Sequence, residues 1–321
     1  MTRRISIGLG LMGFPFSGAE AFWRWVDLCE NSGVDSIWQT DRMIGREPYL
    51  ETLATMAALA GRTRRLKFGM NVLSLGQRDP VLVAKQCATI DYLSGGRLLP
   101  AFGVGSDRSP EWVALNLDPK SRGARTDEAL EIIRRLWTED SVDFDGVHYK
   151  LTGATIAPKP VQADLPIWIG GSSKAAIHRT ARFGTGWQGG AEPPEVVAQV
   201  VADIKIATAA LGRSIDADHY GIGFPFRFGR ADDLPEIGVT MKAFAGSGID
   251  PARWFAIGDA QTILERVTAY IDAGLSKFIL RPLGQGDADV MAQTERLIAE
   301  VIPLVPARWP AAFEITPPSA S

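Results

Sequence analysis

Cysteine and histidine are scarce in this chain of 321 residues. Its two cysteines, Cys29 and Cys87, lie far apart inside helix-like patterns, so we expect buried thiols in a reducing compartment. Its three histidines, His148, His178 and His219, show neither HxxxH nor HExxH spacing, so no metal site is expected.

The chain also lacks a large net charge and long hydrophobic runs. The net charge is −3, which argues against a nucleic-acid partner because nucleic-acid binders usually carry a basic excess. No run approaches 18 uncharged apolar residues, and residues 1–8 show no signal-peptide pattern, so we expect no membrane segment and a cytoplasmic location. Hydrophobic residues make up 46% of the chain, enough for a sizeable core.

What the chain does have is alternation. Short runs rich in Ile, Val, Leu and Phe are each followed by a longer segment of helical period. Eight such runs predict a (β/α)8 TIM barrel with loop insertions, and the expected strands are 5–11, 36–39, 66–73, 98–104, 166–170, 186–189, 220–228 and 278–282.

Helix-start signals support this reading. Ser17 and Glu20 form a potential capping box, Asp79 precedes a proline at a first helical position, and Asp259 precedes another helical pattern. Gly274 stands where a helix would end on a left-handed residue.

Two stretches interrupt the repeat. Residues 138–165 read as a hairpin-like excursion with a Pro-rich return, and residues 231–255 as a second irregular insertion. We expect a single domain over 1–306, and a Pro/Ser/Ala-rich tail over 307–321 that is frayed.

A formal GxGxxG motif follows the first expected strand, at Gly8, Gly10 and Gly13. A dinucleotide-binding fold would start a helix near the second glycine, which would place Pro15 inside that helix at a cost of about 3 kcal/mol. This motif is therefore not read as a nucleotide site.

A better anion site lies in Gly170, Gly171, Ser172 and Ser173. A strand delivers these two glycines and two hydroxyls onto the start of a helix, where free amides and the helix dipole favour an anion. A simple tight turn with a serine cap is the alternative. In a barrel this turn would lie on the C-terminal face, where ligands bind.

Other polar side chains are expected on the same rim. They follow the ends of the second, third, fourth, sixth and eighth strands: Gln39, Thr40, Asp41, Arg42, Asn71, Ser74, Ser106, Asp107, Gln188 and Arg281. Gly103 and Gly105 remove side-chain bulk from the fourth strand, for a flat ligand or for close packing.

Several segments, in order and in spacing, resemble the bacterial luciferase-like flavin-dependent oxidoreductases over about residues 4–300. They are ATIDYLSGGRLLPAFGVG (88–105), RTDEALEIIRRLW (125–137), FDGVHY (144–149), PKPVQ (158–162) and PIWIGGS (166–172).

The resemblance implies a barrel that binds a flavin or deazaflavin at its C-terminal face. It places the cofactor phosphate at Gly170, Gly171, Ser172 and Ser173, beside Gln188. It places the ring against Asn71 and Val72, where relatives often have a non-proline cis peptide, and over Gly103, Gly105 and the following Ser106. Many relatives carry a histidine after the second strand, but here Asp41 is followed by Arg42. This departure argues against proton transfer by a histidine, and it suggests that Arg42 binds a substrate with an anionic or carbonyl group or polarises the flavin.

Two mechanisms follow from the resemblance. In the first, reduced FMN from a separate NAD(P)H-flavin reductase reacts with O2 and oxidises a small organic substrate, with positive charge from Arg42 or Arg281 assisting. In the alternative, F420 exchanges hydride with the substrate and Asp41 moves the proton. A flavin-binding relative without catalysis also fits the pattern.

A phosphate-binding aldolase or isomerase fits less well, because no lysine stands at an expected C-terminal strand end and Lys277 opens the eighth strand at the opposite face. A homodimer is expected, because two helical segments carry apolar residues beyond what a barrel wall needs: Met56, Leu59, Leu82, Val83, Ala88 and Ile90.

Overall fold

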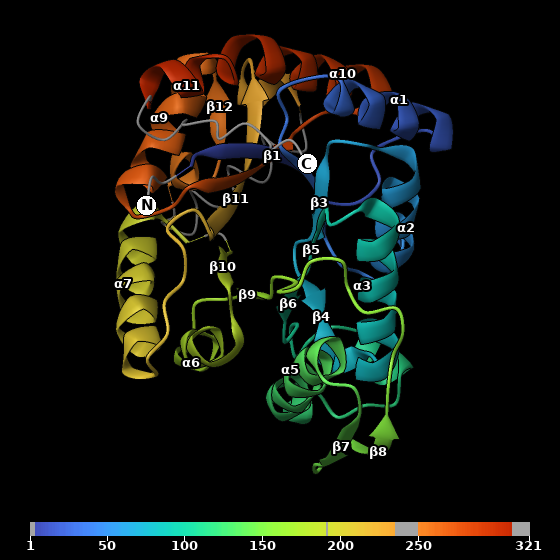
Figure 1. Cartoon of the computed structure of the whole chain (residues 1–321). Helices are drawn as coiled ribbons and strands as arrows, with labels where there is room; N and C mark the ends of the chain where they lie inside the picture. The colour runs from blue at the N-terminus through green and yellow to red at the C-terminus, as the bar shows by residue number, and fades with distance from the viewer. Residues whose placement is uncertain (1–3, 191, 235–249, 310–321) are drawn as a thin grey trace, which may run out of the picture.

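The computed structural model describes residues 4–190, 192–234 and 250–309. Their central element is a curled sheet of parallel strands with helices on its outer side (Figure 1). The strands of this sheet are β1 (Ser6–Leu11), β2 (Ser36–Gln39), β3 (Lys67–Met70), β4 (Leu73–Ser74), β5 (Leu98–Leu99), β6 (Ala101–Gly103), β9 (Trp168–Gly170), β10 (Gly186–Gly189), β11 (Tyr220–Phe228) and β13 (Lys277–Pro282), with β12 (Ala256–Gly258) beside β11.

The sheet closes on itself. Its pairs run β1–β2–β3–β5 on one side of β1 and β1–β13–β11–β10–β9–β6–β4 on the other. Because β3 and β4 are consecutive pieces of the third strand, and β5 and β6 of the fourth, the pairs β3–β5 and β4–β6 join the two ends. The predicted (β/α)8 barrel is confirmed, and the parallel order brings all the carboxyl ends of the strands to one rim.

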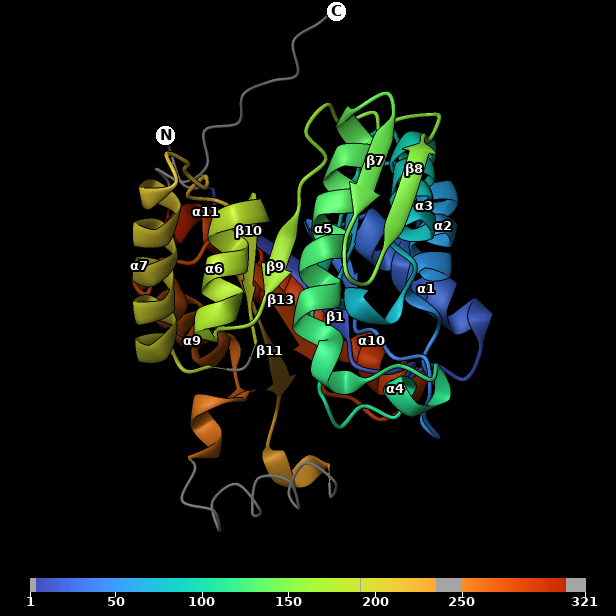
Figure 2. The same cartoon turned by 90° about the horizontal axis from the view of Figure 1, so that it is seen from below.

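The outer layer contains the helices that the alternation predicts, with Figure 2 giving a second view. They are α1 (Ala19–Glu30), α2 (Thr52–Arg62), α3 (Pro80–Ser94), α5 (Arg122–Thr138), α6 (Lys174–Phe183), α7 (Pro194–Ala210), α9 (Ala260–Asp272) and α10 (Gly286–Arg296), with the short α4 (Glu111–Ala114) and α11 (Leu304–Arg308). In the described ranges, no helix is long and apolar enough to cross a membrane.

Two of the predicted helix caps are confirmed. The carboxylate of Asp79 accepts a hydrogen bond from the Leu82 amide at 2.9 Å, and that of Asp259 accepts one from the Thr262 amide at 2.9 Å. Gly274, just beyond α9, has the positive φ of +105° that favours glycine.

The predicted Ser17–Glu20 capping box is wrong. Helix α1 begins at Ala19 with Gly18 as its N-cap, one residue after Ser17, and the amide and hydroxyl of Ser17 donate instead to the carboxylate of Asp287, at the start of α10. The hydrogen-bond donors of Ser17 are thus satisfied by a residue 270 positions away, which a local sequence pattern does not reveal.

The excursion at 138–165 contains the antiparallel hairpin β7 (Val142–Asp145) and β8 (Lys150–Ala154), visible beside α5 in Figure 2. Glu128 of α5 holds it by accepting the amides of residues 147–149. Of the second insertion, 235–249 lie outside the described residues, as do 310–321 of the predicted tail.

Both cysteines lie in the core, as predicted. Neither Cys29 nor Cys87 has measurable exposed surface, and burial raises the pKa of both thiols, so both stay protonated. The apolar residues taken as spare interface are mostly core residues too: Met56, Leu59, Val83, Ala88 and Ile90 are buried within the single chain. Only Leu82 of that set is exposed.

Candidate active site

A cavity of about 280 Å³ opens at the carboxyl ends of the strands, on the rim where ligands bind in barrels. We call it the rim cavity. It brings together seven of the residues predicted from the sequence, from the ends of the second, third, fifth, sixth and eighth strands: Thr40, Asn71, Val72, Gly170, Gly171, Gln188 and Arg281. Met12, Gly189, Gly190 and Gly223 complete its wall.

The break between β3 and β4 forms one wall of the rim cavity. The peptide bond between Asn71 and Val72 is cis, at the position where the family resemblance places such a bond. The Asn71 amide donates to the Gln39 carbonyl at 2.8 Å, which ties the break to the end of β2. Both residues of this bond line the rim cavity.

The glycines of the neighbouring strands accommodate Val72. A Cβ at Gly103 would lie 2.6 Å from Val72 Cγ2, and one at Gly170 would lie 2.9 Å from both methyl groups. Gly103 thus makes room for Val72, a side chain of the neighbouring third strand. Of the two explanations offered for this glycine, this contact agrees with close packing between strands. Gly105, with φ +71°, lies against Ser74, and neither Gly103 nor Gly105 lines the cavity.

The predicted phosphate turn connects β9 to α6. The Ser173 hydroxyl caps the helix by accepting the Ala176 amide at 3.2 Å, and Gly171 has φ +103°, a conformation that favours glycine. The Ser172 hydroxyl is buried and has no hydrogen-bond partner among the described residues. A helix N-terminus with a free hydroxyl beside it suits an anionic group.

Gln188 and Arg281 present two more free polar atoms. Neither Gln188 Oε1 nor Arg281 Nε, both buried, has a partner in the described chain. Arg281 Nη2 donates to the Gly223 carbonyl at 2.8 Å, which anchors the guanidinium beside the cavity. Burial lowers the pKa of Arg281 to about 10, so it remains charged at neutral pH.

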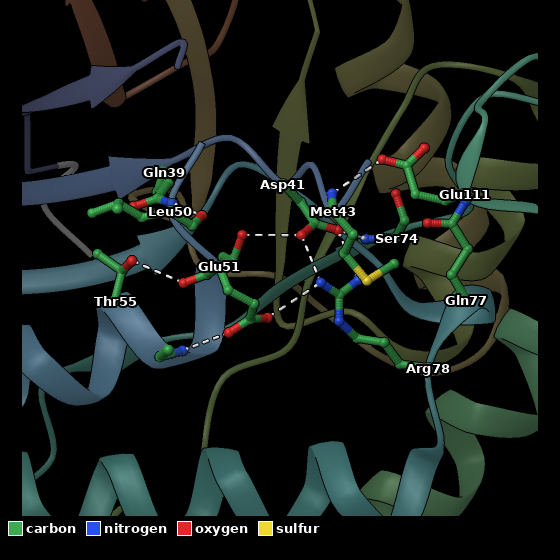
Figure 3. Close-up of polar contacts among 12 residues, drawn as sticks. Gln39, Asp41, Met43, Leu50, Glu51, Thr55, Ser74, Gln77, Arg78 and Glu111 are labelled. Carbon is green, nitrogen blue, oxygen red and sulfur yellow. Dashed lines mark hydrogen bonds and ion pairs between the residues drawn. The ribbon is translucent and has the colours of Figure 1, made fainter. Parts of the chain in front are cut away.

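Asp41 occupies a different environment from the one predicted for a proton carrier. Its carboxylate accepts two bonds from Arg78, at 2.7 and 2.9 Å, one from the Ser74 amide at 2.9 Å and one from the Thr52 hydroxyl at 3.0 Å (Figure 3). It does not line the rim cavity. With all these donors in place, Asp41 joins the segment after β2 to the segment after β4.

Glu111 makes a second connection of this kind. Its carboxylate accepts the amide of Met43 at 3.0 Å (Figure 3). It also accepts the Ile44 amide, at 3.1 Å, and the Ser109 hydroxyl. Burial opposes ionisation of Glu111, but these hydrogen bonds outweigh it and hold its pKa below the ordinary value. The sequence reading missed both Glu111 and Arg78, and no local motif marks either residue.

Arg42 and Ser106 lie on the surface. Arg42 is exposed, with its guanidinium 5.8 Å from the centre of the Tyr49 ring, and it does not line the rim cavity. Ser106 is exposed as well, and its hydroxyl accepts the Arg108 amide at 3.2 Å. Their predicted roles at the cofactor stay predictions.

The sequence profile of a family described as "Luciferase-like monooxygenase" matches residues 7–234, more than half of the chain. The chain belongs to this family. The proteins to which it is similar include some described as F420-dependent and one solved in complex with FMN.

Three relatives show the range of similarity. An uncharacterized protein of Mycobacterium tuberculosis is 36% identical over 169 residues, 52% of this chain and 57% of the relative, so the chain spans just over half of that protein. A 5,10-methylenetetrahydromethanopterin reductase of Archaeoglobus fulgidus is 32% identical, covering 85% of this chain and 72% of the relative. An F420-dependent glucose-6-phosphate dehydrogenase of Nocardia farcinica is 28% identical, covering 80% and 86%.

Solved structures share the fold at low identity. A monooxygenase of Streptomyces bottropensis has a TM-score of 0.80 at 19% identity, covering 93% of this chain and 99% of that one. An F420-dependent secondary alcohol dehydrogenase has a TM-score of 0.77 at 17% sequence identity, and the match covers 98% of this chain and 100% of that chain. A 3,6-diketocamphane monooxygenase of Pseudomonas putida in complex with FMN has a TM-score of 0.75 at 16% sequence identity, and the match covers 94% of this chain and 99% of that chain.

The rim cavity fits a flavin-type cofactor in its chemistry. The buried hydroxyl of Ser172, beside the start of α6, is a free polar group of the kind a phosphate requires. Gln188 Oε1 offers a free acceptor and Arg281 Nε a free donor, which suits a ring with both polar N–H and C=O groups. The chain is thus a member of the luciferase-like monooxygenase family whose rim carries free polar groups that suit a flavin-type cofactor.

Proposed function

We propose that the chain binds F420 in the rim cavity and catalyses hydride transfer to or from a small substrate that bears a carbonyl or anionic group. The observation that carries the proposal is that three side chains at the carboxyl ends of the fifth, sixth and eighth strands, Ser172, Gln188 and Arg281, each have a buried polar atom without a partner among the described residues. F420 is favoured over FMN because an F420-dependent dehydrogenase is among the relatives that match over most of this chain.

When bound, the cofactor supplies the hydride chemistry, and the chain supplies position and charge. The turn at residues 170–173 would hold the phosphate, and the Asn71–Val72 wall would support the ring. Arg281, with its Nη2 fixed to Gly223, would donate from Nε to an anionic or carbonyl oxygen. Such a charge-assisted hydrogen bond is stronger than a neutral one.

The second candidate is the FMN-dependent monooxygenase expected from the sequence. It is supported by the buried positive charge of Arg281, which no carboxylate of the described chain neutralises and which could stabilise negative charge on oxygen. This reading requires a supply of reduced FMN, so it includes a separate NAD(P)H-flavin reductase as a partner.

Side-by-side titrations of the purified apoprotein separate the two candidates. The ligands are F420, FMN, and reduced FMN under anaerobic conditions, each followed by calorimetry. Tight F420 binding with FMN ignored supports the proposal. Preference for reduced FMN, followed by O2 consumption in a stopped-flow cell, supports the monooxygenase instead. Binding of none of the three contradicts both.

A further inference from the structure

A second, smaller cavity lies at the opposite end of the barrel from the rim cavity. It has a volume of about 70 Å³ and lies where β1, β3, β9 and β13 begin. We call it the floor cavity. Its wall consists of Arg4, Ser6, Asp35, Lys67, Leu99, Trp168, Asp218, His219 and Lys277. The catalytic chemistry proposed above uses none of these residues.

Two lysines share one carboxylate in the floor cavity. Lys277, whose side chain is 6% exposed, pairs with Asp35, and Lys67 Nζ lies 3.8 Å from the same carboxylate. Burial would raise the pKa of Asp35, but the two lysines overcome this and hold it below the ordinary value. One carboxylate thus serves two ammonium groups.

The remaining groups near the floor cavity add charges of both signs. The exposed Arg4 side chain has no hydrogen bond or ion pair within the described residues. The Asp218 carboxylate lies 3.9 Å from His219 Nε2, and Asp216, outside the cavity wall, has a carboxylate oxygen within 4.8 Å of both side chains. The excess of positive charge is therefore local to Lys67 and Lys277, which share Asp35.

Hydrogen-bond donors are in excess too. The indole N–H of Trp168 is buried and has no acceptor among the described residues, and the whole residue is 2% exposed. A buried donor without an acceptor is rare in proteins. An ammonium group has three N–H donors, and Asp35 takes one from Lys277.

We propose that the floor cavity binds a small tetrahedral oxyanion, with inorganic phosphate or sulfate as the ligand class. Such an ion carries negative charge and accepts several hydrogen bonds, which matches the two lysines that share Asp35 and the unpartnered indole N–H of Trp168. A water molecule could accept from Trp168 but would leave one of the two lysines without its own counter-charge. The volume exceeds the roughly 30 Å³ that one water occupies in the liquid, so there is room for a larger group.

Thermal unfolding in the presence of phosphate tests the proposal. A ligand that binds only the folded state raises the melting temperature saturably. The turn at residues 170–173 also suits phosphate, so the measurement starts from a variant in which that turn is disabled. This parent variant carries Gly171→Asp, or Ser172→Ala if Gly171→Asp does not fold. At constant ionic strength, we expect phosphate to raise the parent's Tm by about 2 °C.

Three further variants locate the effect. In the same background, Lys67→Met and Trp168→Phe should abolish at least half of the phosphate response, whereas Lys120→Met, an exposed lysine elsewhere, should keep it. Lys67 is partly exposed, so its variant tests the site even if Trp168→Phe fails to fold. An unchanged response in Lys67→Met, or an equal response to chloride, overturns the proposal.

Discussion

Arg78 and Asp41 form a doubly hydrogen-bonded ion pair inside the protein. Nη2 lies 2.7 Å from Oδ1 and Nη1 lies 2.9 Å from Oδ2, and the two side chains are 9% and 3% exposed. Asp41 also accepts the Ser74 amide, four residues before Arg78. The pair therefore holds the chain just beyond the Asn71–Val72 wall of the rim cavity.

Asp41→Asn should lower the free energy of unfolding by about 3 kcal/mol, because it leaves the buried Arg78 charge with only the exposed Glu51 carboxylate, 3.4 Å away, as a partner. Urea denaturation measures the loss. The matched control is Asp27→Asn, which breaks the ion pair between Asp27 and Arg62, whose side chains are 44% and 49% exposed. That variant should be nearly unchanged, and equal losses in the two variants would contradict the interpretation.

Gly171→Asp should abolish cofactor binding, because it places a carboxylate at the predicted phosphate turn. Position 171 has φ +103°, so any side chain there also strains the backbone. Gly212→Asp is the matched control. Gly212 also has a positive φ, +67°, and open space around it, but it follows α7 and does not belong to the phosphate turn. Calorimetric titration should show binding lost in the first variant and retained in the second.

Arg281→Met should reduce kcat/KM by roughly 10- to 100-fold, the effect of losing one hydrogen bond from a charged donor. Steady-state kinetics measures it. Arg42→Ala should leave cofactor affinity nearly intact and reduce turnover less than Arg281→Met, because Arg42 is exposed and lies outside the cavity wall. A larger effect at Arg42 would reverse this ranking and restore the role expected for it from the sequence.

Stability should fall in acid partly through Glu111. Its pKa in the folded protein lies below its ordinary value, so its contribution is present above that ordinary value, near pH 4.5, and is lost as the pH falls toward the folded value. The unfolding free energy of Glu111→Gln should be lower than that of the wild type at pH 7 and should depend less on pH between 5 and 3. Parallel curves for the two proteins would exclude this contribution.

We still expect a homodimer, formed through exposed leucines of α3 and not through the six apolar residues named from the sequence, of which only Leu82 is exposed. Leu82 and Leu93 on α3 are 57% and 63% exposed, and they lie eleven residues apart, close to three helical turns, on one face. Leu82→Glu with Leu93→Glu should give a monomer in sedimentation velocity at micromolar concentration while retaining cofactor binding. A monomeric wild-type protein would refute the prediction.

The sequence predicts the barrel well because each strand and helix carries its own periodic pattern. The Asn71–Val72 break and the turn at residues 170–173 lie where the family motifs place them. Gln188 and Arg281 reach the cavity because strand ends in a parallel barrel share one rim.

Contacts between distant segments were not accessible in this way. Asp41 reads as a rim acid until Arg78, 37 residues later, is placed against it. Ser17 reads as a helix cap until Asp287 is found beside it. In both cases the chemistry of the side chain was evident, and its partner was set by the folding of the whole chain.

The seating of Val72 between Gly103 and Gly170 has a genetic consequence. Alanine at position 103 alone would collide with Val72 Cγ2, whereas Val72→Ala would remove that methyl group. The two changes should therefore be tolerated together more readily than Gly103→Ala alone, so these positions are expected to be epistatic. Directed evolution of this rim is best served by libraries that vary positions 72, 103 and 170 together.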